Sequence, residues 1–109
     1  MIAVIGDIIK SKSILDRQKT QQELQSVLLQ INQRHQASLA SRFTITLGDE
    51  FQGLFKDSKG LLHILDEISF ALRPIRLRFG IGVGTLTTEL DPTTSIGADG
   101  PVYWKAREA

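Results

Sequence analysis

The sequence predicts an α+β domain in which one antiparallel sheet carries both of its helices on the same face. Two kinds of periodicity predict it, because some stretches alternate apolar and polar residues every second position and others repeat every three to four. The stretches with strand character are 2–5, 43–47, 51–55 and 75–86, and those with helical character are 14–35 and 57–73. Their order is strand, helix, strand, strand, helix, strand, which is the ferredoxin-like (split βαβ) order.

Composition sets the limits on partners and on organisation. The chain has 109 residues, 13 Lys and Arg against 12 Asp and Glu, and no Cys. We expect a single domain over 1–109. The charge balance argues against a nucleic-acid or membrane-surface binder, and the lack of Cys excludes disulfides and Cys-based metal sites. No stretch reaches the roughly 18 apolar residues of a membrane span, so we expect a cytoplasmic protein without a membrane partner.

The first strand and helix follow directly from residue patterns. Residues 2–5 are an unbroken apolar run closed by Gly6 and Asp7, which favours a central strand with an acid at its end. Over 14–35 the apolar residues recur at helical spacing, which predicts a long amphipathic helix. They are Leu24, Val27, Leu28 and Ile31.

The middle of the chain predicts a hairpin. Phe43, Ile45 and Leu47 alternate with threonines, as a half-buried strand does. Gly48 and Asp49 then supply turn dihedrals before the next strand, 51–55. The hairpin therefore shows two acids at its tip, and we expect Glu50 to point away from Asp49.

A second helix and a last strand complete the pattern. Asp57 and Ser58 offer a helix cap, and Pro74 ends the helix. Its expected buried stripe is Leu61, Leu62, Leu65, Ile68 and Leu72. In the last strand one face is apolar and the other holds arginines and glycines. The apolar face is Leu77, Phe79, Ile81 and Val83, and the other is Arg76, Arg78, Gly80, Gly82 and Gly84.

The glycine face is expected to leave room for a ligand or another chain, because glycine inside a strand weakens it and marks a close approach. No element of the predicted fold covers this face of the sheet. A further helix is predicted to begin at Pro101.

Two acids suggest a metal site. The first strand and the hairpin are neighbours in this fold, so Asp7 and Asp49 are predicted to meet at one edge of the sheet. Mg²⁺ commonly binds one or two carboxylates together with water and nucleotide phosphates. The structural alternative is that Asp7 caps a turn and Asp49 only forms one.

Phosphate contacts are predicted from two further segments. Main-chain N–H groups after Asp7, at Ile8 and Ile9, together with Lys10, could face a triphosphate. On the final helix, Arg107 lies one turn after Tyr103 and could bind phosphate. Capping and solvation explain the first segment equally well, and an exposed Arg explains the second. The two histidines are expected at the surface.

Four ordered blocks carry a family resemblance that spans essentially the whole chain. They are GDIIKSK at 6–12, FTITLGDEFQGLF at 43–55, IRLRFGIGVGTLTTE at 75–89 and IGADGPVYWKAREA at 96–109. Together they resemble the SatD family of bacterial proteins. The resemblance implies a longer chain of which this is an N-terminal part, and it carries no established activity.

The same blocks more distantly resemble class III nucleotidyl cyclases and, through GDEF, the GGDEF diguanylate cyclases. This implies a palm domain that binds a nucleoside triphosphate with Mg²⁺ held by Asp7 and Asp49, with nucleotidyl transfer or cyclisation as the reaction. It also implies a homodimer, in which Arg107 of one subunit steadies phosphate across a shared cleft. Gly80 and Gly82 would let the substrate approach the sheet.

The chain departs from the cyclase pattern at several positions. Tyr103 stands where cyclases carry an Asn, and Leu47 replaces the first Gly of GGDEF. Ile45 and Ile96 occupy positions at which adenylyl cyclases read the base with polar side chains. The alternative function is therefore a non-catalytic regulatory, dimerisation or nucleotide-sensing module.

Overall fold

The computed structural model describes residues 1–9 and 17–84. The elements are β1 (Ile2–Ile8), α1 (Arg17–Arg34), a short 3₁₀ helix η2 (Gln36–Ser38), β2 (Leu39–Leu47), β3 (Glu50–Phe55), α2 (Leu61–Leu72) and β4 (Leu77–Val83). The helix predicted from Pro101 lies outside the described residues.

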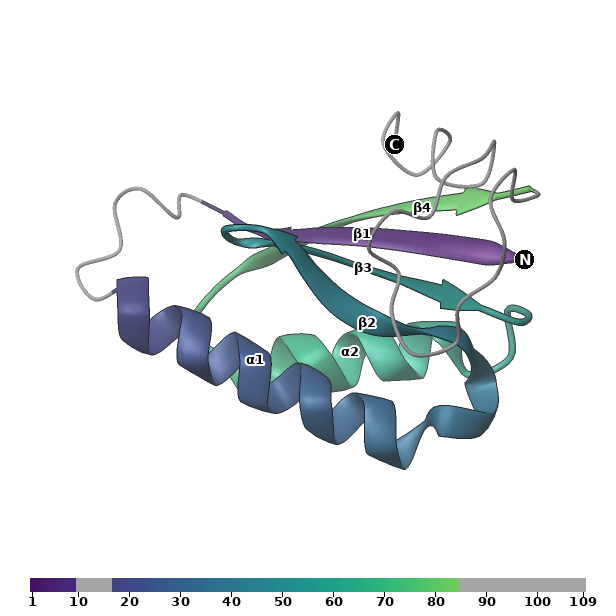
Figure 1. Ribbon diagram of the computed structural model, residues 1–109, viewed down its shortest axis with the longest axis horizontal. Coiled ribbons are helices and arrows are strands. Elements are labelled where there is room, and N and C mark those ends of the chain that lie inside the picture. Colours follow the sequence, from purple (N-terminus) through teal and green to yellow (C-terminus); the bar gives the residue numbers. More distant parts are fainter. Residues whose placement is uncertain (10–16, 85–109) are drawn as a thin grey trace.

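The sheet has the strand order β2-β3-β1-β4, and every neighbouring pair is antiparallel. Both helices lie on the same face of it (Figure 1). The predicted ferredoxin-like arrangement is therefore confirmed. Neither α1 nor α2 is long and apolar enough to cross a membrane.

Several predicted boundaries and faces differ in detail. β1 continues through Gly6 and Asp7. β2 begins four residues earlier than predicted, because the buried Leu39 already pairs with Phe55 of β3. On α2, Ile64 is buried while Leu62 is 70% exposed. The reason is that the helix begins at Leu61, from which positions i+3 and i+4 face the sheet.

The predicted cap of α2 is also wrong. Gly60, in a left-handed conformation, precedes the helix, and no side chain caps it. The carboxylate of Asp57 instead accepts the main-chain N–H of Lys59 at 2.9 Å. This Asp therefore shapes the turn before the helix.

On β4, Leu77 and Phe79 pack against the core as predicted. Val83 on the same face is 59% exposed, because β4 is the last strand of the sheet and the core cluster stops at Phe79. On the opposite face, Ala3 and Leu54 pair with each other and are fully buried. The expectation of an uncovered face is therefore wrong at these positions.

A cluster of phenylalanines fills the space between sheet and helices. Phe51 meets Phe43 and Phe79 edge to face, with ring centroids 6.0 Å apart in both pairs. The ring of Phe51 also lies directly over Gly6, its cross-strand partner on β1. A Cβ atom at Gly6 would lie 2.4 Å from Cζ of Phe51, so only glycine fits beneath this ring.

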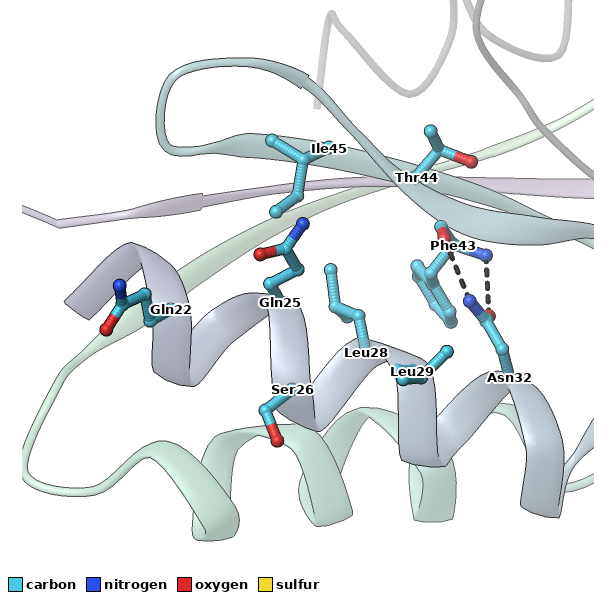
Figure 2. A pocket seen from close by; sticks show the side chains of 9 residues that line it. All are labelled: Gln22, Gln25, Ser26, Leu28, Leu29, Asn32, Phe43, Thr44 and Ile45. Atoms are coloured by element: carbon cyan, nitrogen blue, oxygen red, sulfur yellow. Dashed lines mark hydrogen bonds between the residues drawn. The ribbon is translucent and has the colours of Figure 1, made fainter. Parts of the chain in front are cut away.

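One buried polar side chain joins α1 to the edge of the sheet. The Asn32 amide accepts the N–H of Phe43 at 2.8 Å and donates to the carbonyl of the same residue at 3.0 Å (Figure 2). Asn32 is 8% exposed, so these bonds satisfy groups that would otherwise be buried without partners. This contact lies within the shift in the pairing of β2 with β3 between Ser41 and Thr44.

Ion pairs between side chains join the two helices. The Glu67 carboxylate on α2 pairs with Arg34 and with Nε2 of His35, the latter at 2.9 Å. The hydrogen bond with His35, with a further contribution from the positive charge of Arg34, holds the pKa of Glu67 below its ordinary value of 4.5. His35, expected at the surface, is a half-buried partner in this cluster.

We predict that Gly6→Ala lowers the free energy of unfolding by about 1–3 kcal/mol, the usual cost of overpacking a filled core. The Phe51 ring cannot yield, since it is fully buried between two other rings. Chemical denaturation of Gly6→Ala, Phe51→Leu and the double variant measures this. The cost of Gly6→Ala should shrink in the Phe51→Leu background, and an equal cost in both backgrounds would contradict the steric argument.

We also predict an acid-dependent loss of stability through Glu67. An acid whose pKa is lowered on folding stabilises the folded state above its ordinary pKa, and that contribution disappears as the pH falls through the lowered value. Glu67→Gln should therefore be less stable than the wild type at neutral pH, and the difference should close below pH 4.5. Thermal unfolding against pH tests this, with Asp66→Asn, an exposed acid on the same helix, as the control. A difference that persists unchanged in acid would refute the linkage.

Candidate functional site

Asp7 lies near the end of β1 on the face of the sheet opposite the helices. Side chains alternate along a strand, so Asp7 must face away when Gly6 faces the phenylalanine cluster. Its cross-strand partners are Glu50 on β3 and Arg78 on β4. Directly opposed residues of antiparallel strands share a face, and a row of Glu50, Asp7 and Arg78 therefore crosses three strands.

Arg78 holds the Asp7 carboxylate with two hydrogen bonds. Its Nε lies 3.2 Å from Oδ1 and its Nη2 lies 3.0 Å from Oδ2. This is the two-pronged geometry in which the planar guanidinium matches a carboxylate. The hydrogen bond with Asp7, and the attraction of its charge, raise the pKa of Arg78 above its ordinary value.

Asp49 lies in the β2–β3 turn, at the same end of the sheet as Asp7. Its carboxylate is directed to α1, where Arg17 Nη2 lies 3.3 Å from Oδ2 and Gln21 Nε2 lies 3.3 Å from Oδ1. The Asp49 side chain is only 11% exposed. The structure thus brings the two predicted acids to one end of the sheet but gives each its own cationic partner.

Glu50 is the acid that shares the face of Asp7, which the sequence pattern did not indicate. It is the first residue of β3, and Thr46 Oγ1 lies 3.4 Å from its carbonyl oxygen and 3.5 Å from its carboxylate. The turn occupies only Gly48 and Asp49, so Glu50 already follows strand alternation. Across residues 1–9 and 17–84 no three acidic or histidine side chains are clustered closely enough to hold a metal ion.

The segment after Asp7 is engaged in the fold. The side chain of Ile8 is 4% exposed and belongs to the core. The N–H of Ile9 donates to the carbonyl of Arg76 at 2.9 Å, which extends the pairing of β1 with β4. Ile8 and Ile9 therefore fix the end of β1, while Lys10 lies outside the described residues.

The predicted glycines lie on the same face as Asp7. Gly80 is opposite Ile5 and Gly82 is opposite Ala3 on β1, farther along the sheet from the acids. Gly82 is buried and Gly80 is half-buried. Arg107, Tyr103 and Ile96 lie outside the described residues.

A groove of about 560 Å³ lies between α1 and β2 (Figure 2). Its lining is uncharged, with Gln22, Gln25 and Asn32 among the polar residues and Leu29 and Ile45 among the apolar ones. Among residues 1–9 and 17–84, none of the predicted metal or phosphate residues lines it. Ile45, whose position in cyclases reads the base, points toward α1 and pairs with the buried Phe51. It therefore faces away from the side of the sheet that carries Asp7.

The arginine partners of the two acids were not predicted from the sequence, although both arginines fall at regular positions in their elements. Arg78 falls on the same face as the strand glycines, and only the register of β4 with β1 shows that it meets Asp7. Arg17 and Gln21 are one helical turn apart, so both reach the same acid from one side of α1.

Two solved structures with the same fold are catalytic domains of guanylyl cyclases. One is the catalytic core of a rhodopsin-guanylyl cyclase with converted specificity in complex with ATPalphaS, with 18% identity, a TM-score of 0.65, and coverage of 97% of this chain and 68% of that one. Another is the non-canonical dimeric guanylyl cyclase domain of the RhoGC fusion protein from the aquatic fungus Blastocladiella emersonii, with 16% identity, a TM-score of 0.64, and coverage of 97% and 70%. At this identity the likeness establishes the fold, and the predicted cyclase-like palm is confirmed at that level.

Among curated proteins, no sequence matches the chain. The model of the SatD family, in contrast, matches residues 1–109. The match spans all four sequence blocks that carry the resemblance. The chain therefore belongs to the SatD family.

Proposed function

We propose that this SatD-family chain is a nucleotide-binding palm domain that takes a nucleoside triphosphate with Mg²⁺ at the Asp7 end of the sheet. The observation that carries the proposal is the register of β1 with β3. It sets Asp7 opposite Glu50, at the same end of the sheet as the turn that holds Asp49.

The donor chemistry of this end fits the ion. Mg²⁺ prefers oxygen ligands and needs only one or two carboxylates, since water and phosphate oxygens complete its coordination. Asp7 and Asp49 supply them in the proposal, and a bound Mg²⁺ would offset the charge of the phosphates. One structural neighbour, a rhodopsin-guanylyl cyclase core, was crystallised in complex with ATPalphaS, which supports a nucleotide as the ligand.

Other residues take supporting roles in the proposal. Ile8 and Ile9 fix the end of β1 beside the phosphates, and Lys10 adds a positive charge there. Gly80 and Gly82 lie on the side of Asp7, opposite Ile5 and Ala3, and in the proposal they let the substrate approach the sheet. Arg107 steadies phosphate from the second subunit of a homodimer, a state supported by the dimeric fungal guanylyl cyclase domain of the same fold.

A second function is favoured by a specific observation. Both acids already have a cationic partner, Arg78 for Asp7 and Arg17 for Asp49. This arrangement suits a regulatory or dimerisation module in which the acids shape the fold. Tyr103 in place of the cyclase Asn also favours a module without cyclase activity. Binding of Mg²⁺ and nucleotide separates the two functions.

We predict that Asp7→Asn and Asp49→Asn each weaken Mg²⁺-dependent binding of ATP or GTP by at least about tenfold, since a charge-assisted contact contributes about 1.5–3 kcal/mol. Isothermal titration calorimetry with each nucleotide, with and without Mg²⁺, measures this. Glu50→Gln shows whether the acid on the face of Asp7 also contributes. Asp66→Asn, an exposed acid on α2, is the matched control and should bind like the wild type.

The outcomes separate the two functions. Wild-type affinity in both Asp variants would show that the acids hold no metal. Loss of folding in the Asp49→Asn protein, seen by circular dichroism, together with no nucleotide binding by the wild type, would establish the structural role instead.

A further inference from the structure

We propose that Arg78 is a built-in competitor of the metal ion at Asp7, so that cation binding at this site requires the Arg78 guanidinium to leave. This inference rests on the proposed function and assigns its regulation to one residue. The competition follows from contacts within the described sheet.

Arg78 engages both oxygens of Asp7, at 3.2 and 3.0 Å, and the two residues are directly opposed on β4 and β1. An ion that binds this carboxylate must therefore displace at least one guanidinium N–H. Because the strand pairing fixes the two backbones, the Arg78 side chain is the part that moves.

The ion pair between Arg78 and Asp7 can open. The side chains of Arg78 and Asp7 are 71% and 37% exposed, and exposed ion pairs are weak because water and salt screen them. Asp49 differs, because it is 11% exposed and held from α1 by both Arg17 and Gln21. Asp7 is therefore the acid that is released more readily.

The row that crosses β3, β1 and β4 places charged side chains on both sides of Asp7. Glu50 lies on the other side of Asp7 from Arg78. The Arg78 guanidinium offsets the charge of Asp7, so its withdrawal leaves a carboxylate that attracts a cation more strongly. The same movement thus vacates Asp7 and raises the affinity of the site for a divalent ion.

The size of the effect follows from the competition. The apparent dissociation constant of the ion equals its intrinsic dissociation constant divided by the fraction of molecules in which the pair is open. For an exposed pair we expect this factor to be roughly two- to fivefold. The arginine therefore tunes metal affinity without abolishing it.

Mn²⁺ binding, followed by electron paramagnetic resonance of the free ion, tests the proposal on the whole chain without nucleotide. Arg78→Gln should bind Mn²⁺ roughly two- to fivefold more tightly than Arg76→Gln, the matched control. Arg76 is exposed and lies two residues earlier in the chain, so each variant loses one positive charge. Arg78→Lys, which keeps the charge but not the two-pronged contact, should fall between the wild type and Arg78→Gln. Adding Asp7→Asn to Arg78→Gln should remove the gain.

Equal or weaker Mn²⁺ binding by Arg78→Gln relative to Arg76→Gln would overturn the competition. If the wild type still binds Mg²⁺ and nucleotide through Asp7 in that case, the proposed function stands and only the role of Arg78 is wrong. Binding of Mn²⁺ that is absent, or indifferent to Asp7, in every protein would overturn both. Thermal unfolding of each variant verifies that the changes do not reflect loss of the fold.

Discussion

The contact of the Phe51 ring with Gly6 is the constraint on which the rest of the molecule depends. It fixes the register of β1 against β3 at Gly6, since no side chain fits between the ring and the glycine. Phe79, on the other neighbour of β1, packs against the same ring. Strands β3, β1 and β4 are therefore aligned by one aromatic group.

The position of the acid follows from this alignment. Because Gly6 is turned toward the helices, the next residue must face the opposite side, and the next residue is Asp7. Its neighbours in the row are then Glu50 and Arg78, which the register selects. The packing of the core thus determines which charged side chains meet on the face opposite the helices. A shift of one residue in the strand pairing would turn each of them to the other face.

Most of the fold was accessible from the sequence, and the failures have physical causes. Periodicity identified α1 and the hairpin because their apolar residues face one core. It misplaced Leu62 because the true start of α2 depends on Gly60 rather than on Asp57. It treated Val83 as core because alternation does not reveal where the covering helices stop.

The site was predictable only in part, for a similar reason. Sequence order brings Asp7 and Asp49 to one end of the sheet, which any ferredoxin-like arrangement requires. The direction of Glu50 depends on how many residues the turn uses, and the arginine partners depend on register. These are properties of pairing between distant segments, which local patterns do not contain.

The two hydrogen bonds between the Asn32 amide and the main chain of Phe43 have a consequence for how the protein behaves in a crowded solution. β2 is an outer strand of the sheet, and outer strands offer main-chain groups on which strands of other molecules can grow. At Phe43 both of these groups are already taken by a side chain from the same molecule. The Asn32 amide thus takes the place of a neighbouring strand at one residue. At that residue, a strand of another molecule cannot begin the ordered pairing that leads to fibrils.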